Sequence, residues 1–290
     1  DAPVSIGPNT NLSAVARLYT DPALSDATDQ PNRWGGIAFD HADHTGVLSN
    51  VVIRGASLAG ADAVNMKAAV SALGSDLYMR GLDIDDVLLP IFAQEGNSVI
   101  LENSRIFIDV IGDGINIKRA RYARVEGCDF SSASLTVDTD AIDYDGIQGG
   151  IIRGNWLHNF MGGNNDAVDI GEGTIDLLVE SNRIERCFDK GVSIGQGSTA
   201  LVRRNVISEV DMGLGIKDSG SYGLVENNTF RDLAHAVAVY EKNLGAGGGS
   251  AQVRNCIVSH ASDVPFTCDA LSELSVSYTL CDTEPSAGAG

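Results

Sequence analysis

The chain has 290 residues, a formal net charge of −19 at pH 7 and only 6% aromatic residues. This acidity excludes a nucleic-acid-binding protein, because phosphate recognition needs a basic stripe and the sequence has none. No run of 18 apolar residues occurs, so no membrane span is predicted. The 33 glycines, together with many Asn, Asp and Ser residues, are typical of tight turns between short strands.

Residues 1–33 contain one short strand-like run, residues 4–6, followed by a stretch rich in Asp, Thr, Pro and Asn. We predict an N-terminal cap and loop there, one regular domain over residues 34–285, and a tail or linker over residues 286–290. The chain begins without Met or an apolar leader, which suits a processed secreted protein or a trimmed chain. A secreted or cell-surface location is therefore expected.

The regular part opens at residues 34–39, and residues 47–58 begin a phrase that returns along the chain. Its echoes occupy residues 77–84, 99–106, 123–130, 150–157, 177–184, 200–207, 223–230 and 251–257. A repeat of 22 to 27 residues with short strands and Gly or Asn turns predicts an all-β fold, the parallel β-helix. Each turn of the chain, called a rung below, then stacks about 4.8 Å above the previous one. We predict a single-stranded parallel β-helix of about ten rungs with three short strands each, right-handed because parallel crossovers strongly prefer that hand.

Two segments interrupt this pattern. The Ala-rich residues 61–74 predict a short helix or an insertion, and the Gly-rich residues 245–250 predict a flexible loop. Both are expected to lie outside the stacked strands.

An Asn stands two residues before the last apolar residue in five consecutive echoes, with spacings of 27, 23, 23 and 27. These residues are Asn155, Asn182, Asn205, Asn228 and Asn255. Each is expected to occupy a left-handed bend and to hydrogen-bond the equivalent turn of the next rung.

A second phrase returns four times, in residues 140–145, 166–171, 190–195 and 212–217. Its apolar residues alternate, which predicts strands with one buried face and one polar face. Stacked in register, the polar residues form three columns. The first contains Asp113, Asp140, Asp166, Lys190, Met212 and His235; the second contains Asn116, Asp143, Asp169 and Ser193; the third contains Lys118, Asp145, Gly171, Gly195, Lys217 and Tyr240.

Carboxylates stacked about 4.8 Å apart repel one another, so one should hold its proton to higher pH or a cation should lie between them. A raised pKa makes a general acid, and a metal polarises a substrate carboxyl. The spacing and the missing terminal Glu exclude an EF-hand. Calcium across rungs remains an expectation, with ligands drawn from Asp138, Asp140, Asp143, Asp145, Asp166 and Asp169. The alternative is that these Asp residues only solvate the sheet face.

The catalytic candidates are Asp140, Asp166, Lys190 and Lys217. The substrate-binding candidates are Asp143, Asp169, Ser193, His235 and Tyr240. Both lysines have a structural alternative, a salt bridge of Lys217 with Asp145 or the Asp169 region and one of Lys190 with Asp189. His235 is expected to have a structural or groove-lining role. Tyr240 and Trp156 can each stack on a sugar ring, but Trp156 is expected to pack away from this face.

The five cysteines are odd in number and contain no Cys-x-x-Cys pair. A disulfide between Cys256 and either Cys268 or Cys281 would cross-link the last rungs. Isolated buried thiols are the alternative.

Roughly residues 34–280 resemble the right-handed parallel β-helix (pectin-lyase-like) superfamily. The Trp-Gly-Gly-Ile opening and the phrase at residues 189–196 resemble β-helix domains of bacterial surface and secreted proteins. The polar face is more distantly similar to polygalacturonase-like glycoside hydrolases, whose four site phrases correspond to residues 138–141, 165–166, 189–191 and 215–217. Three family residues are retained, as Asp140, Asp166 and Lys217. Three are replaced, by Asn165, Lys190 and Gly215.

The resemblance implies an extracellular carbohydrate-active protein that cleaves glycosidic bonds of a polysaccharide. As a hydrolase, one protonated Asp would donate to the leaving oxygen while the other activates water, with inverting carboxyls about 6.5–9.5 Å apart. As a lyase, a neutral Lys would take the proton beside a uronate carboxyl neutralised by a cation. The alternative is a non-catalytic glycan-binding or structural surface module, with calcium or solubility as the role of the Asp columns.

Overall fold

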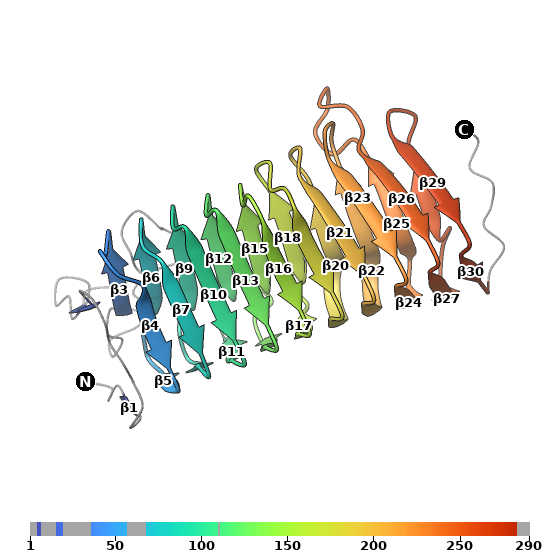
Figure 1. The fold of residues 1–290 in the computed structure, drawn as a ribbon. Coiled ribbons are helices and arrows are strands. Elements are labelled where there is room, and N and C mark those ends of the chain that lie inside the picture. Colours follow the sequence, from blue (N-terminus) through green and yellow to red (C-terminus); the bar gives the residue numbers. More distant parts are fainter. Residues whose placement is uncertain (1–4, 7–15, 20–35, 57–67, 110, 283–290) are drawn as a thin grey trace.

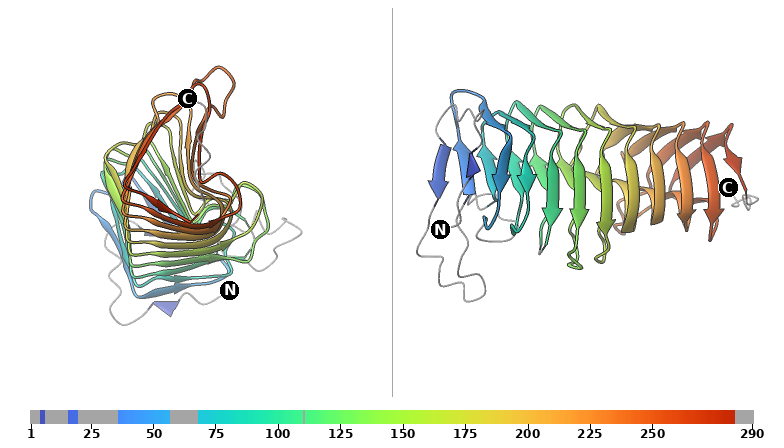
Figure 2. Two further views of the ribbon diagram at one scale, coloured as in Figure 1. Left: turned by 90° about the vertical axis from the view of Figure 1, so that its right-hand side faces the viewer. Right: turned by 90° about the horizontal axis from the view of Figure 1, so that it is seen from below.

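The computed structural model describes residues 5–6, 16–19, 36–56, 68–109 and 111–282, and their regular secondary structure is entirely β-strand. The strands stack along one axis as the rungs of a parallel β-helix (Figure 1). Seen down that axis, the rungs lie over one another (Figure 2). The predicted all-β fold class is confirmed. Among the described residues, none lie in a helix that could cross a membrane.

Each rung contributes to three stacks of parallel strands. The first stack contains β3 (Gly36–Asp40), β6 (Val70–Leu73), β9 (Ile91–Gln94), β12 (Ile115–Lys118), β15 (Ile142–Asp145), β18 (Val168–Gly171), the ends of β20 (Arg183–Ile194) and β22 (Val206–Lys217), β25 (His235–Tyr240) and β28 (Phe266–Cys268). The second stack contains β4 (Gly46–Ser49), β7 (Leu77–Arg80), β10 (Ser98–Glu102), β13 (Tyr122–Glu126), β16 (Gly150–Arg153), β19 (Leu177–Glu180), β21 (Thr199–Arg203), β23 (Tyr222–Glu226), β26 (Ser250–Arg254) and β29 (Glu273–Ser277). The third stack contains β5 (Val51–Ile53), β8 (Asp83–Ile84), β11 (Arg105–Ile108), β14 (Asp129–Ser132), β17 (Trp156–Phe160), the starts of β20 and β22, β24 (Thr229–Leu233), β27 (Ile257–Ala261) and β30 (Leu280–Cys281).

The interior of the coil is filled by the alternating apolar residues of these strands. In the first stack, Ile142 pairs in register with Val168, and Val168 with Val192, and all three are fully buried. The polar residues between them point the other way, because successive side chains of a strand face opposite sides. The alternation predicted for the repeated phrase is therefore observed, and it places the polar columns on the outside of the first stack.

The corners between stacks use backbone in the left-handed region, which costs an L-residue of the order of 1 kcal/mol unless hydrogen bonds between rungs fix it. The corner after the first stack has positive φ at Gly74, Glu95, Arg119, Gly146, Glu172, Gln196 and Asp218. The corner after the second stack has positive φ at Asn50, Gly81, Asn103, Gly127, Gly154, Ser181, Arg204, Asn227, Asn255 and Tyr278. The corner after the third stack has positive φ at Asn159, Arg186, Glu209, Asp232 and His260.

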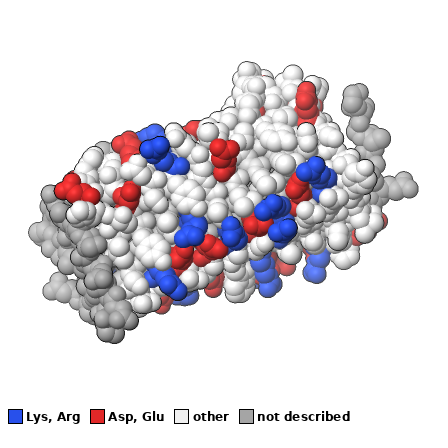
Figure 3. Space-filling model, viewed as in Figure 1, with Lys and Arg blue, Asp and Glu red and all other residues white. Residues whose placement is uncertain are grey.

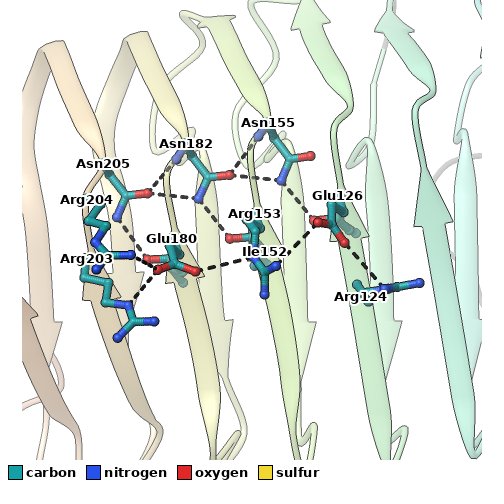
Figure 4. Close-up of polar contacts among 12 residues, drawn as sticks. Arg124, Glu126, Ile152, Arg153, Asn155, Glu180, Asn182, Arg203, Arg204 and Asn205 are labelled. Atoms are coloured by element: carbon teal, nitrogen blue, oxygen red, sulfur yellow. Dashed lines mark hydrogen bonds and ion pairs between the residues drawn. The ribbon is translucent and has the colours of Figure 1, made fainter.

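A ladder of Asn side chains runs through the corner between the second and third stacks (Figure 4). Asn182 Oδ1 accepts hydrogen bonds from the backbone N and from Nδ2 of Asn155, both at 3.0 Å. Asn182 Nδ2 donates to the Ile152 carbonyl and to Asn205 Oδ1, also at 3.0 Å. Asn205 bonds Asn228 in the same way. The predicted hydrogen bonding between rungs is thus observed for four of the five Asn residues.

Two details of that prediction are wrong: the membership of Asn255 in the ladder, and the position of the other four Asn residues in the left-handed bend. Cys256, and not Asn255, follows Asn228 in the ladder, because Thr229 pairs in register with Ile257. Asn255 instead occupies the left-handed bend, with φ of 54°. The four ladder Asn residues lie one position after the bend, so their side chains point inward and are buried.

Charged side chains of both signs follow one another along the second stack. Lys and Arg residues alternate with Asp and Glu residues in a band across one face (Figure 3). Glu180 contacts Arg153 at 3.4 Å and Arg203 at 2.8 Å, and Glu126 contacts Arg153 at 3.6 Å (Figure 4). The net acidity of the chain is therefore locally balanced on this face.

Within the Ala-rich segment, residues 70–73 form the strand β6. Residues 61–67 lie outside the described residues, as do residues 34–35. Val70 and Ala72 of β6 pair with Ile37 and Phe39 of β3 and are buried over them, so burial in the stack overrides the helical propensity of the segment. At the N-terminal end, β1 (Ser5–Ile6) and β2 (Ala16–Tyr19) pair antiparallel with β5 and β3, in the part predicted to be a cap.

Of the two alternatives for the cysteines, the structure has isolated thiols and not the disulfide, since all five cysteines are free. Cys256 occupies the ladder corner, with its Sγ 3.4 Å from the Arg254 carbonyl. Cys268 lies on the first stack and Cys281 on the third, so the three thiols belong to different sides of the coil.

Candidate functional site

The three polar columns predicted from the repeated phrase lie in register on the first stack. Asn116 pairs with Asp143, Asp143 with Asp169, and Asp169 with Ser193. Lys118 pairs with Asp145, and Lys217 with Tyr240, in the third column. Lys190 pairs with Met212 and Met212 with His235 in the first. The structure therefore brings every predicted site residue of these columns onto one face.

The Asp residues of the first column form a second ladder. Asp113 Oδ1 accepts the backbone N–H of Asp140 at 3.0 Å, and Asp140 Oδ1 accepts that of Asp166 at 2.6 Å. Asp166 Oδ1 accepts the backbone N–H of Lys190 at 2.9 Å. Asp140 is 8% exposed and Asp166 is 3% exposed. These carboxylates thus lie beneath the surface and tie neighbouring rungs together.

Burial dominates the proton affinity of these carboxyls. It raises the pKa of Asp113 to about 6, and it raises that of Asp166 to about 7 although the Lys190 ammonium acts in the opposite direction. Burial and the charges of Asp166 and Asp113 raise the pKa of Asp140 well above its usual range. Burial, and then the charges of Asp113 and Asp145, likewise raise the pKa of Asp143 well above its usual range. The cluster therefore holds protons at mildly acidic pH.

Lys190 is a buried partner of the first column. Its ammonium contacts the Asp189 carboxylate and lies 3.5 Å from Asp166 Oδ1, and the residue is only 2% exposed. Burial lowers its pKa, but the charge of Asp166 and the hydrogen bond to Asp189 outweigh this and raise the pKa above its usual value. A Cβ at Gly215 would lie 2.6 Å from Lys190 Cδ, so the missing side chain there makes room for the lysine. The salt bridge with Asp189 weighed as an alternative is present.

Lys217 is the lysine that reaches an open cavity. Its Nζ lies 3.8 Å from Asp169 Oδ1. Burial lowers its pKa, more than the charges of Asp169 and Asp166 raise it. Lys217 is therefore the better proton acceptor of the two lysines.

The cavity beside Lys217, called the charged cavity below, has a volume of about 170 Å³. Its lining includes the Asp169 carboxylate, which is 36% exposed, and the side chains of Lys242 and Gln196. Gly171 and Gly195 of the third column form its floor. Asp145, which also lines it, pairs with Lys118 at 2.5 Å, so the salt bridge weighed as an alternative for Lys217 is formed with Asp169 and not with Asp145.

A second cavity, called the apolar cavity below, lies further along the same face. It has a volume of about 340 Å³, and Met212, His235, Ala238, Tyr240 and Thr267 line it together with Val239, Cys268 and Asp269. His235 Nδ1 donates to the Val264 carbonyl at 2.8 Å, which fixes the ring at the wall. The groove-lining position expected for His235 is therefore observed.

Two residues considered in the sequence do not line either cavity, Ser193 because it is buried and Trp156 because it lies on another stack. Ser193 is fully buried, and its Oγ has no hydrogen-bond partner among the described residues. Trp156 lies on the third stack, where its ring stacks on His158 and its Nε1 donates to Glu185 at 2.8 Å. Trp156 thus packs away from the site, as expected.

Lys242 is a cavity residue that the sequence pattern did not reveal. Asp218 accepts the backbone N–H groups of Lys242 and Asn243 at 2.7 Å and 2.9 Å, and it thereby holds the loop that follows β25. The available signal was weak, because Lys242 lies two positions beyond the third column, outside the repeated phrase.

The carboxylates as placed do not form a calcium cage. Within residues 36–56, 68–109 and 111–282, no group of three or more His, Cys, Asp or Glu side chains is arranged to hold a metal ion. Asp138 is bonded by Asn164, Asp143 by Asn116 and Asp145 by Lys118, whereas calcium needs six to eight oxygens. Calcium binding by these Asp residues stays a prediction.

Residues 113–277, more than half of the chain, match the family described as the right handed beta helix region. The chain belongs to this right-handed β-helix family. By sequence, no curated protein matches this β-helix protein. The match covers the rungs that carry the polar columns, and it confirms the predicted hand and superfamily.

Two solved structures are similar in fold. A hyperthermoactive exopolygalacturonase from Thermotoga maritima has a TM-score of 0.50 and 13% identity, over 71% of this chain and 53% of that one. This β-helix protein thus spans about half of the exopolygalacturonase. A double mutant of the periplasmic alginate epimerase AlgG has a TM-score of 0.49 and 10% identity, over 87% of this chain and 76% of that one. At such identities the likeness concerns the fold.

Proposed function

We propose that this β-helix protein is an extracellular carbohydrate-active enzyme that cleaves an acidic polysaccharide by β-elimination on its first stack. The observation that carries the proposal is Lys217, a lysine with a lowered pKa on the wall of an open cavity. A lysine desolvated in this way gives up its proton more readily than an exposed lysine, as a general base must. The exopolygalacturonase of similar fold is named for an enzyme that acts on polygalacturonate, an acidic polysaccharide, which agrees with this substrate class.

In the proposed step, the neutral Lys217 amine takes the proton from the carbon next to a uronate carboxyl. The carbon–oxygen bond to the leaving sugar breaks, a carbon–carbon double bond forms in the uronate ring, and the leaving oxygen takes a proton from solvent. The exposed Lys242 ammonium, on the wall of the same cavity, would offset the uronate charge. A local cation is needed there because the chain as a whole, at −19, repels acidic polymers.

The site geometry supports hydrolysis by Asp140 and Asp166 less well. Their raised pKa values suit a general acid, but neither carboxylate lines the charged cavity, and each accepts a backbone N–H from the next rung. A general acid must come within hydrogen-bond reach of the leaving oxygen. In the proposal these two residues, with Lys190, support the site and keep Lys217 desolvated.

A non-catalytic glycan-binding or structural module is the second candidate function. The Asp ladder favours it, because a chain of carboxyls bonded to backbone N–H groups has a structural role whether or not a substrate binds. In that case the charged cavity would bind a glycan without cleaving it.

A panel of acidic and neutral polysaccharides tests these candidates. Reducing ends without unsaturated uronates indicate hydrolysis, and both signals together indicate elimination. We expect both signals on an acidic polymer and neither on a neutral one. Binding without cleavage would support the non-catalytic module, and hydrolysis alone would contradict the assignment of Lys217.

A further inference from the structure

We infer that the first stack selects a heteropolymer in which a uronate is followed by a neutral sugar, in preference to a homopolymer of uronates. This inference rests on the proposed function and adds the substrate class. The charged and apolar cavities lie in succession along one face, and their linings differ in the chemistry that they offer to neighbouring sugars.

The charged cavity offers a cation to a carboxylate. Lys217 and Lys242 line it, and Lys242 is exposed. Of its carboxylates, Asp169 is 3.8 Å from Lys217 and Asp145 is paired with Lys118. A uronate bound here therefore meets the Lys242 ammonium.

The apolar cavity offers a uronate no such partner. Met212, Ala238, Val239 and the Tyr240 ring form its walls, and neither Lys nor Arg lines it. Its remaining charged side chain is Asp269, an exposed carboxylate that would repel a second uronate. The sequence after Arg254 contains no Lys or Arg at all, so the last rungs supply no distant cation either.

The nearby Lys190 does not alter this conclusion. Its ammonium contacts Asp189 and Asp166 and is buried beneath the columns, so its charge is already matched by carboxylates. An aromatic and thioether wall instead suits the C–H face of a neutral sugar ring. The sugar hydroxyls would then face solvent and the polar rim at Thr267.

The two cavities are placed for neighbouring sugars of one chain. Lys217 of the charged cavity pairs in register with Tyr240 of the apolar cavity, which puts them on adjacent rungs. Adjacent rungs are separated by about 4.8 Å. A chain lying along the axis therefore passes from one cavity to the next within one or two sugars.

Calorimetric titration of the whole chain with three tetrasaccharides tests the inference, with product analysis after each titration to separate binding from turnover. The probes are a galacturonate homopolymer, an alternating galacturonate–rhamnose oligomer and neutral cellotetraose. We expect the alternating probe to bind about 10-fold more tightly than the homopolymer, because the homopolymer places a second carboxylate in the apolar cavity, where it has no cation and is repelled by Asp269. Cellotetraose should bind more weakly than the alternating probe.

The variant Thr267→Lys adds a cation to the apolar cavity and should bring the two acidic probes to within about 3-fold of each other. Ser259→Lys is the matched control, because it adds the same charge to a partly exposed residue of the third stack and should leave the ratio unchanged. Equal or tighter binding of the homopolymer by the wild type overturns this inference alone. A ratio that Thr267→Lys leaves unchanged overturns the assignment to this cavity. Failure of both acidic probes to bind overturns the proposed function as well.

Discussion

The Asn ladder gives a prediction whose magnitude follows from its hydrogen bonds. Asn182→Ala removes two hydrogen bonds accepted from Asn155 and two donated to Ile152 and Asn205. It leaves the backbone N–H of Asn155 and the carbonyl of Ile152 buried without these partners. Each such group costs about 1–3 kcal/mol, so we expect the free energy of unfolding to fall by about 3–5 kcal/mol.

Urea unfolding measures this change as a shift of the midpoint at constant slope. Asn97→Ala is the matched control, because Asn97 is exposed, and it should change stability by less than about 0.5 kcal/mol. Asn182→Ser should fall between the two, since Ser104 occupies the same ladder position and its Oγ accepts the Leu82 N–H at 3.0 Å. Equal stabilities of the Asn182→Ala and Asn97→Ala variants would refute the energetic role of the ladder.

The remaining predictions concern the buried polar groups. Because folding raises the pKa of Asp113 to about 6 and that of Asp166 to about 7 from 3.8, the folded state binds more protons between pH 4 and 7. The free energy of unfolding should therefore decrease by a few kcal/mol as the pH rises through this window, and urea titrations that show a constant or increasing value would contradict it. Tyr144→Phe removes a buried hydroxyl without a hydrogen-bond partner among the described residues, so stability should rise by about 1 kcal/mol in the same assay; a loss would mean that the hydroxyl is bonded. If calcium binds between the Asp residues, as the sequence predicts, titration at millimolar calcium should give a saturable heat of binding, and its absence would remove the calcium prediction.

The sequence predicts the fold and the strand register because both depend on patterns that recur in every rung. The alternation of Ile142 and Tyr144 with polar residues is repeated in three later phrases, and a shift by one residue would expose the apolar set. The placing of Asp140, Asp166 and Lys190 in one column follows from that register alone.

The Asn ladder shows where repetition becomes ambiguous. Asn227 and Asn228 are adjacent, one in the bend and one in the ladder, and in the next rung only the bend residue is Asn. A pattern of Asn residues cannot separate these two positions, because Asn suits both a left-handed bend and a buried amide contact. The structure separates them by the direction of the side chain.

Burial of the site residues could not be derived from the sequence. Asp166 and Asp169 are three residues apart in the same phrase, yet the first is covered and bonded to the next rung whereas the second faces the charged cavity. The exposure of each residue depends on neighbouring side chains and on the loops between stacks, and these loops do not repeat in sequence. For the same reason the sequence ranked Lys190 and Lys217 equally, although Lys190 is held by two carboxylates.

The most direct test of the central claim compares the wild type with Lys217→Met on an acidic polysaccharide that the wild type cleaves, with the rate of unsaturated uronate formation as the readout. Loss of a general base should lower this rate by about 10²- to 10⁴-fold. Arg231→Met is the control, because it likewise replaces one cation by Met, but at an exposed residue of the third stack that lines neither cavity, and it should retain the rate within a few-fold. Unsaturated product formed by Lys217→Met at the wild-type rate would contradict the account.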